Sequence, residues 1–201
     1  MSELVLASAS PRRQELLRLI GLPFRVIPSD FDESTLPLWP PDEHVLRSAT
    51  AKAEDVAARI EEGVVIGADT IVVVDDQVLG KPADADDARR MLRLLSGRSH
   101  YVYTGVCVVR RSSGETVRTA RDFVRTEVRF CAMSDATIDA YVATGEPLDK
   151  AGAYGIQGYG ALLVTAIEGC YFNVMGLPLA RLRALFRELE GLAADEGSAD
   201  A

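Results

Sequence analysis

The chain has 201 residues, 48% of them hydrophobic, which suits one domain with a substantial core and excludes wholesale disorder. Its 22 basic and 30 acidic residues give a formal net charge of −8, which argues against binding a nucleic-acid polymer or an anionic membrane. The three widely spaced cysteines, Cys107, Cys131 and Cys170, predict buried, reduced thiols rather than disulfides or a metal site. Because the sequence shows no signal-peptide or membrane-spanning apolar stretch, we expect a cytoplasmic protein.

The N-terminal stretch combines a short strand with the start of a helix. Residues 4–6 form an apolar run long enough for a buried strand. Pro11 fits the first helical position, which makes Ser10 the expected N-cap of a helix that stops at Gly21. The apolar residues at helical spacing are Leu16, Leu19 and Ile20.

The same turn gathers hydroxyl groups and arginines at a helix N-terminus. Ser8 and Ser10 supply the hydroxyls, while Arg12 and Arg13 lie in the first helical turn, where the helix dipole disfavours cations. Free backbone N–H groups, hydroxyls and guanidinium groups together favour a phosphate site. A strand-to-helix turn with solvated surface arginines is the alternative, and this stretch alone leaves both interpretations open.

A second strand over residues 24–27 is followed by a long polar loop over residues 28–41, which carries Asp30, Asp32 and Glu33. Loops of this length in compact domains are often functional, although most acidic loop residues are only solvated.

Residues 42–62 have the periodicity of a helix, with an apolar stripe made of Val45, Ala49, Val56 and Ile60. Lys52 falls on that stripe, so its side chain is expected to face inward. Its position is consistent both with a snorkelling lysine and with a buried cationic role.

Asp69 is unusual because it lies between two runs of β-branched residues, 64–66 and 71–74, which predict strands. A buried, unpaired carboxylate is costly, so Asp69 is expected either at a strand end facing a cleft or beside cationic neighbours. Gly67 and Ala68 are expected to leave room for a ligand to approach the backbone. These features favour a functional carboxylate over a structural capping aspartate.

A turn after this strand predicts a hairpin that returns through residues 78–79 and places Lys81 at its mouth, near the Asp69 end. The next expected elements are a helix over residues 84–96, a long hairpin of strands 100–109 and 116–130, and a helix over residues 134–144.

The glycine-rich segment over residues 146–160 is the second unusual stretch. Glycines allow tight turns and close backbone approach to a ligand, and the tyrosines in this segment favour a binding loop over a flexible linker. A strand over residues 161–167 is expected to follow. The last helix is expected after Pro178, with inward residues Leu179, Leu182, Phe186 and Leu189. We expect a single domain over residues 1–192 and a disordered acidic tail over residues 193–201.

Alternating strands and helices followed by a long hairpin predict an α/β, mixed α+β, domain with a mixed sheet. The candidate cations are Arg12, Arg13, Lys52 and Lys81, and the candidate acids are Glu33 and Asp69. The cations can neutralise a triphosphate, and the carboxylates can hold a divalent metal and activate water. Hydrolysis within a polyphosphate is the reaction class that these residues imply.

Five motifs occur in order along the chain: Ser8-Ala9-Ser10-Pro11-Arg12-Arg13, Gly67-Ala68-Asp69-Thr70, Gly80-Lys81-Pro82, Asp149-Lys150-Ala151-Gly152-Ala153-Tyr154-Gly155-Ile156-Gln157-Gly158 and Gly176-Leu177-Pro178. With these motifs the chain closely resembles the Maf family (septum formation protein Maf), nucleoside triphosphate pyrophosphatases. The resemblance runs from about residue 3 to residue 190. The Arg110–Asp122 hairpin and the tail after Glu190 match little.

The resemblance implies cleavage between the α- and β-phosphates, which gives a nucleoside monophosphate and pyrophosphate with the help of Mg²⁺ or Mn²⁺. It implies a twisted mixed β-sheet flanked by helices, with two lobes around a cleft, similar to inosine triphosphate pyrophosphatases. Asp69 would be the proton acceptor and would share the metal with Glu33. Arg12, Thr70 and Gln157 match positions tied to substrate choice. The other expected substrate-binding residues are Ser8, Ser10, Arg13, Lys52 and Lys81.

The Ile156-Gln157-Gly158 form resembles the branch that acts on dTTP and UTP, and a glutamine amide suits a pyrimidine edge because it both donates and accepts hydrogen bonds. The same reaction on 7-methyl-GTP or another modified nucleotide is one alternative. A non-catalytic, nucleotide-binding regulator of septation is another. The resemblance also implies house-cleaning of non-standard nucleotides and a link to septum formation or division arrest. A homodimer is an assembly that the sequence leaves open.

Overall fold

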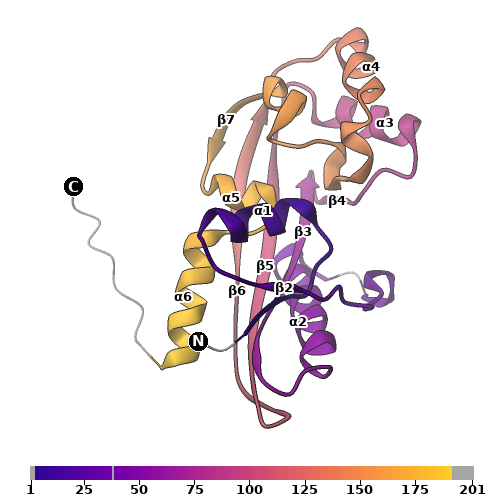
Figure 1. Ribbon diagram of the computed structural model, residues 1–201. Helices are drawn as coiled ribbons and strands as arrows, with labels where there is room; N and C mark the ends of the chain where they lie inside the picture. Colours follow the sequence, from indigo (N-terminus) through magenta and orange to yellow (C-terminus); the bar gives the residue numbers. More distant parts are fainter. Residues whose placement is uncertain (1–2, 38, 192–201) are drawn as a thin grey trace, which may run out of the picture.

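The computed structural model describes residues 3–37 and 39–191 (Figure 1). The expected tail over residues 193–201 lies outside the described residues. The strands are β1 (Leu4–Leu6), β2 (Arg25–Val26), β3 (Gly63–Val74), β4 (Gln77–Leu79), β5 (Ser99–Ser112), β6 (Glu115–Phe130) and β7 (Val164–Glu168). The α-helices are α1 (Pro11–Leu19), α2 (Pro41–Ala57), α3 (Ala85–Leu95), α4 (Asp135–Ala143), α5 (Tyr171–Met175) and α6 (Leu179–Glu190). Short 3₁₀ turns are η1 (Glu33–Thr35), η2 (Glu146–Asp149), η3 (Ala151–Ala153) and η4 (Gly158–Leu163).

The strands form one mixed sheet, which confirms the expected fold class. Its order is β2-β1-β3-β5-β6-β7, with β1 parallel to β2 and β3, and with β4 paired to β3. The pairs β3–β5, β5–β6 and β6–β7 are antiparallel. The long strands β3, β5 and β6 run through the molecule and join two lobes (Figure 1). The lower lobe contains β1, β2, α1, α2 and α6, and the upper lobe contains β4, α3, α4, β7 and the turns η2–η4.

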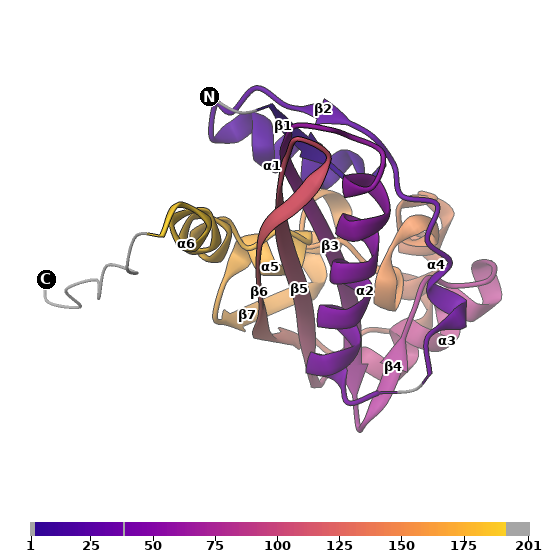
Figure 2. The same cartoon turned by 90° about the horizontal axis from the view of Figure 1, so that it is seen from below.

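Side chains that alternate along the strands fill two cores in the lower lobe. One face of the sheet packs on α2 through Val65 and Cys107, and the other packs on α1 and α6 through Ile66 and Val108. Figure 2 shows α2 on one side of these strands and α6 on the other. Because neighbouring residues of a strand point to opposite faces, Asp69 lies on the α2 face and Thr70 on the opposite face.

The helix α2 approaches the sheet closely because glycines lie beneath it. A Cβ atom added to Gly67 of β3 would collide with the carbonyl oxygen of Ala49, and one added to Gly105 of β5 would collide with that of Val45. The expectation that Gly67 leaves room for a ligand is therefore wrong, because the space is taken by α2. This close packing brings Lys52 of α2 down to the strand that carries Asp69.

One edge of β3 is left open between the two lobes. On its other edge β3 pairs with β5 along residues 63–73. On the open side, β1 pairs with residues 64–66 and β4 pairs with residues 72–74. Residues 67–71 have neither of these strands beside them, so both faces of the sheet can be reached from this gap.

Several expected boundaries differ from the structure. The two short strands around Asp69 are one continuous strand, because Lys52 compensates the carboxylate that seemed to interrupt it. The helix expected over residues 42–62 ends at Ala57, and β7 begins at Val164 rather than at residue 161. The short helix α5 was not expected.

Some expected buried positions are also wrong. In α1 the buried residues are Leu16 and Leu17, while Leu19 is 66% exposed because α1 rests on the sheet with only one narrow face. Cys107 is buried, but Cys131 and Cys170 are half-buried, and all three are free thiols. In α6 the fully buried residues are Leu182, Leu185 and Leu189, with Leu179 and Phe186 partly buried beside them.

Candidate active site

A cavity of about 590 Å³ lies at the open edge of β3, between the lobes. Its walls come from the β1–α1 turn, the loop before α2, the middle of β3, the end of the β4 hairpin, the segment from the end of η2 to Gln157, and the end of α5 with Gly176. The structure brings all the expected site residues to this cavity: Ser8, Ser10, Arg12, Arg13, Glu33, Lys52, Asp69, Thr70, Lys81 and Gln157.

The Asp69 carboxylate is the most buried acid in the cavity wall, and only 5% of the residue is exposed. Lys52, which is 8% exposed, places its Nζ 2.8 Å from Asp69 Oδ1 and 2.5 Å from Glu33 Oε1. Burial by itself would raise the pKa of Asp69, but the charge and hydrogen bond of Lys52 and the charge of Arg13 outweigh it, so the pKa is lowered. Asp69 is thus held as a carboxylate at neutral pH, which confirms the expected cationic neighbours.

The donor set at this position suits a divalent cation shared with a substrate. Within residues 3–37 and 39–191, no three His, Cys, Asp or Glu side chains gather closely enough to hold a metal by themselves. Asp69 and Glu33 nevertheless converge on one point, because the same Lys52 ammonium binds both. Mg²⁺ commonly takes one or two carboxylates and completes its shell with water and substrate phosphates.

Arg13 ties three parts of the cavity wall together. Its Nε donates to the carbonyl oxygen of Gly176 at 2.9 Å, its Nη1 to Ser8 Oγ at 3.0 Å and its Nη2 to Thr70 Oγ1 at 3.1 Å. Burial lowers the pKa of Arg13, and the charges of Asp69 and Glu33 partly oppose this shift. Three of its five N–H groups are therefore committed to the protein, which leaves two for a phosphate.

The helix N-terminus beside Arg13 is not capped by a side chain. Ser10 occupies the N-cap position as expected, but its hydroxyl makes no capping hydrogen bond, and its own N–H donates to Ser8 Oγ at 3.3 Å. The first turn of α1 also contains Arg12 and therefore keeps the features expected of an anion site.

Arg12 reaches across the cavity from the lower lobe to the upper lobe. Its Nη1 lies 3.2 Å from Asp149 Oδ2, and Lys150 Nζ binds Asp149 Oδ1 at 2.6 Å. Burial alone would raise the pKa of Asp149, but the hydrogen bond from Lys150 and the charge of Arg12 lower it. Lys81 also lines the cavity, is exposed, and makes no hydrogen bond or ion pair with the described residues, which leaves its ammonium available.

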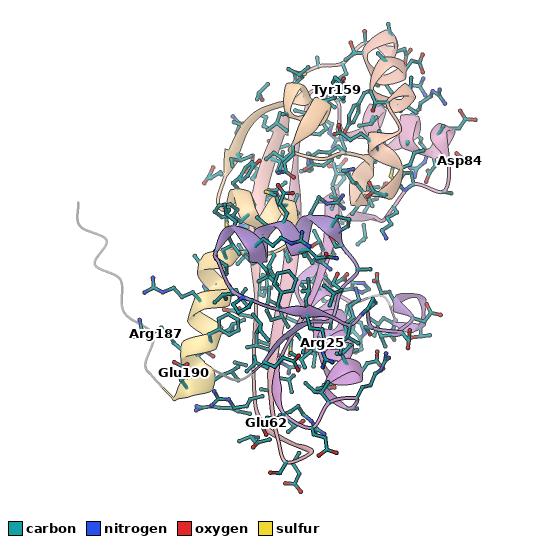
Figure 3. The ribbon with its side chains drawn as sticks, in the orientation of Figure 1. Arg25, Glu62, Asp84, Tyr159, Arg187 and Glu190 are labelled. Carbon is teal, nitrogen blue, oxygen red and sulfur yellow. The ribbon has the colours of Figure 1, made fainter. Side chains whose placement is uncertain are left out.

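Gln157 is held in the wall by a clamp that lies behind it. The Tyr141 hydroxyl donates to Glu146 Oε1 at 2.7 Å and accepts the N–H of Gly155 at 3.1 Å. Glu146 also accepts the N–H of Tyr159 at 2.9 Å. Figure 3 labels Tyr159 in the upper lobe. The backbone on both sides of Gln157 is fixed in this way.

A further group of polar residues was missed by the sequence analysis. Thr104 Oγ1 lies 3.0 Å from Thr70 Oγ1 and donates to the carbonyl oxygen of Asn173 at 2.9 Å. Asn173 Nδ2 in turn donates to Thr126 Oγ1 at 2.9 Å. Thr104, Thr126 and Asn173 are fully buried. Buried hydroxyls inside an apolar strand were the signal that could have revealed them, because such groups need partners.

A sequence profile described as "Maf-like protein" matches residues 3–189. A Moorella thermoacetica protein named dTTP/UTP pyrophosphatase is 57% identical over 185 residues, which cover 92% of this chain and 94% of the relative. Proteins of the same name from Anaeromyxobacter dehalogenans and Bacillus cytotoxicus are 55% and 49% identical, covering 92% and 90% of this chain and 92% and 93% of their own lengths.

Two solved structures are also similar. One is a nucleoside-triphosphatase / dITP/XTP pyrophosphatase from Mycobacterium abscessus, with a TM-score of 0.41, 12% identity, and coverage of 94% of this chain and 96% of its own. The other is the Staphylococcus aureus Ham1 protein, with a TM-score of 0.42, 18% identity, and coverage of 79% and 77%. No helix in the described ranges is long and apolar enough to cross a membrane.

Proposed function

Because this chain belongs to the family of Maf-like proteins, we propose that it hydrolyses dTTP and UTP to the nucleoside monophosphate and pyrophosphate. The single observation that carries the proposal is the buried Asp69 carboxylate, held ionised by Lys52 in a cavity lined by further cations. The names of the similar proteins support the choice of dTTP and UTP.

The proposed reaction uses residues on both sides of the open strand edge. A water oxygen attacks the α-phosphorus, and the water's proton passes to the Asp69 carboxylate. The bond between the α-phosphorus and the oxygen that bridges it to the β-phosphorus breaks. Pyrophosphate leaves with that electron pair. Lys52 keeps the carboxylate in place, and Arg12, Arg13 and Lys81 offset the charge of the phosphates.

Asp69 and Glu33 are the residues that would hold a divalent cation, together with the phosphates. Such a cation supplies Lewis-acid stabilisation of the charge that develops on phosphate oxygens. Metal dependence is tested by omitting Mg²⁺ and Mn²⁺, and Glu33→Gln is expected to raise the metal concentration that gives half-maximal rate.

The central experiment measures pyrophosphate release from dTTP, UTP, CTP, GTP and 7-methyl-GTP in separate reactions with Mg²⁺ or Mn²⁺. Release chiefly from dTTP and UTP supports the proposal. Release chiefly from 7-methyl-GTP keeps the reaction and overturns the interpretation of Gln157. Nucleotide binding without any release would instead favour a regulatory role.

Asp69→Asn tests the assigned base, because the amide cannot accept the water's proton as a carboxylate does. A loss of about a thousandfold or more in kcat is expected for a group that supplies both proton transfer and metal binding. Asp86→Asn is the matched control, since Asp86 lies on the surface of α3, where its side chain is 93% exposed. Near-normal turnover of the Asp69 variant would overturn the assignment. The link to septum formation and the homodimer stay predictions.

A further inference from the structure

The hydrogen-bond chain behind Thr70 has a direction that the donors and acceptors fix. A guanidinium only donates, so in its 3.1 Å bond with Arg13 Nη2 the Thr70 oxygen accepts. A carbonyl oxygen only accepts, so Thr104 gives its single hydroxyl proton to Asn173. In the 3.0 Å bond between the two threonines, Thr70 must therefore be the donor.

This direction uses up the only proton of the Thr70 hydroxyl. One lone pair of its oxygen is occupied by Arg13, and one lone pair is left for another partner. Thr70 lines the cavity and is the only residue of β3 that is not buried, so this lone pair is accessible to a ligand. The hydroxyl can accept one more hydrogen bond and has none to give.

We propose that Thr104 is a positioning residue that makes the Thr70 hydroxyl an acceptor for an N–H or O–H group of the nucleoside. The inference rests on the proposed function and deepens it. Phosphate oxygens of a nucleotide are acceptors, so a hydroxyl that can only accept cannot form a hydrogen bond with them. The nucleoside therefore lies at Thr70, on the face of the sheet opposite Lys52, and the phosphates lie toward Asp69 and Lys52.

The rigidity of the chain supports this role. Thr104 is completely buried on β5, directly across from Thr70 in the strand register. The acceptor of its proton, the carbonyl of Asn173, is held in turn because the Asn173 side chain donates to Val102 O at 3.0 Å and to Thr126 Oγ1 at 2.9 Å. Each hydroxyl of the network and the Asn173 amide nitrogen have partners, and these bonds fix the orientation, although Asn173 Oδ1 has no partner among the described residues.

Thr104→Val tests the inference because it keeps the shape of the side chain and removes the hydroxyl. The Thr70 hydroxyl hydrogen then has no acceptor at Thr104. The hydroxyl can rotate so that this hydrogen points into the cavity, where it opposes the hydrogen-bond donor of the nucleoside. Thr104→Ser keeps the hydroxyl and is the matched variant that should restore binding. Thr70→Val removes the acceptor itself. Because Thr70 is only half-buried, this variant does not depend on whether the buried Thr104 site tolerates a substitution.

Two probes separate the nucleoside from the phosphates in titration calorimetry. One is a non-hydrolysable α,β-imido analogue of dUTP, and the other is inorganic tripolyphosphate, which has no nucleoside. Thr104→Val and Thr70→Val should each weaken binding of the dUTP analogue about tenfold, which is the scale of one lost hydrogen bond. Both variants should leave binding of tripolyphosphate unchanged. Thr104→Ser should bind both probes as the unmodified chain does.

Equal weakening of both probes would overturn the inference, because Thr70 would then serve the phosphates. Unchanged analogue binding in Thr104→Val, or a loss that Thr104→Ser shares, would overturn it as well. Because calorimetry needs no turnover, the result is independent of the proposed reaction. An unmodified chain that binds the analogue as expected but releases no pyrophosphate from dTTP or UTP would contradict the proposed function alone.

Discussion

Lys52 Nζ lies 2.8 Å from Asp69 Oδ1 and 2.5 Å from Glu33 Oε1, so one buried ammonium joins the central strand to the loop before α2. Removing one member of a buried ion pair leaves the other charge without compensation. This relationship therefore makes both the stability and the pH response of the site depend on Lys52.

Lys52→Met should lower the free energy of unfolding at pH 7 by about 3–5 kcal/mol, as expected when a buried pair is broken. The double variant Lys52→Met/Asp69→Asn should recover part of this loss because it buries no unpaired charge. Urea unfolding of the single and double variants measures both effects. Equal stability of the unmodified chain and the single variant would contradict the prediction.

The same pair predicts how stability responds to acid. The pKa of Asp69 is lowered in the folded state, so its contribution is present above the unfolded value of 3.8 and is lost as the pH falls through the lower, folded value. In Lys52→Met, burial is the largest influence on Asp69 and is opposed mainly by the charge of Arg13, so the pKa of Asp69 should rise and the variant should instead gain stability as the pH falls toward 4. The difference in unfolding free energy between the unmodified chain and Lys52→Met should therefore shrink as the pH falls toward 4, because the other titrating groups are common to both chains.

His100 should make the protein less stable between pH 7 and pH 4.5. The residue is 1% exposed, and burial lowers its pKa from 6.5 to about 4. Since the unfolded chain binds the proton more readily, stability falls as the pH drops through 6.5 and levels off below the folded value, by about 2–3 kcal/mol at pH 4.5. In His100→Asn, the unfolding free energy should lack this part of its pH dependence. Urea unfolding at several pH values measures it.

The His100 variant also has a constant cost, because His100 Nε2 and the Tyr154 hydroxyl lie 2.7 Å apart in a hydrogen bond. That loss is the same at every pH in this range, so the slope and not the absolute stability tests the prediction. A His100→Asn variant with the full slope would show that other groups carry the proton uptake.

Gly67→Ala and Gly105→Ala should each push α2 away from the sheet. The new methyl group would collide with a backbone carbonyl of α2, which cannot rotate aside as a flexible side chain can. We expect losses of about 1–3 kcal/mol in stability from overpacking, together with a fall in pyrophosphate release as Lys52 moves from Asp69. Gly80→Ala is the control for unfolding free energy, since a Cβ there meets no atom within 4 Å.

Glu146→Ala should relax base selectivity without touching the reacting phosphates. The variant removes the acceptor for Tyr141 and for the N–H groups of Tyr159 and Gly160, so the backbone around Gln157 loses its clamp. The ratio of kcat/KM for UTP over CTP should fall by about tenfold, the scale of one or two hydrogen bonds. Steady-state kinetics on both nucleotides measures it.

Tyr141→Phe is the milder partner of that variant, because it removes the hydroxyl that links Glu146 to Gly155 and keeps the ring. It should shift the same selectivity ratio in the same direction and by less. A loss of kcat for both nucleotides with an unchanged ratio would assign Glu146 and Tyr141 to general stability instead.

Local sequence patterns predicted a large part of the site. Helical spacing placed Lys52 on the inward stripe of α2, and the cost of an unpaired carboxylate in a strand run required a cation beside Asp69. Both inferences follow from nearest-neighbour periodicity and from the energetics of burial. The same reasoning could not predict that Gly67 makes room for α2. In the sequence, a glycine that lies against a ligand cannot be told from one that lies against a helix.

By itself, the sequence determined most of the elements, the inward position of Lys52 and the need of Asp69 for a cationic partner, because those properties follow from chain periodicity and solvation. Only the tertiary structure decided that β1 and β4 share one edge of β3 and leave residues 67–71 open between them. It also decided that Thr70, Thr104 and Asn173, which are far apart in the chain, form one hydrogen-bond chain with a fixed donor-to-acceptor direction. Strand pairing and hydrogen-bond direction depend on contacts between distant segments, which no local pattern encodes.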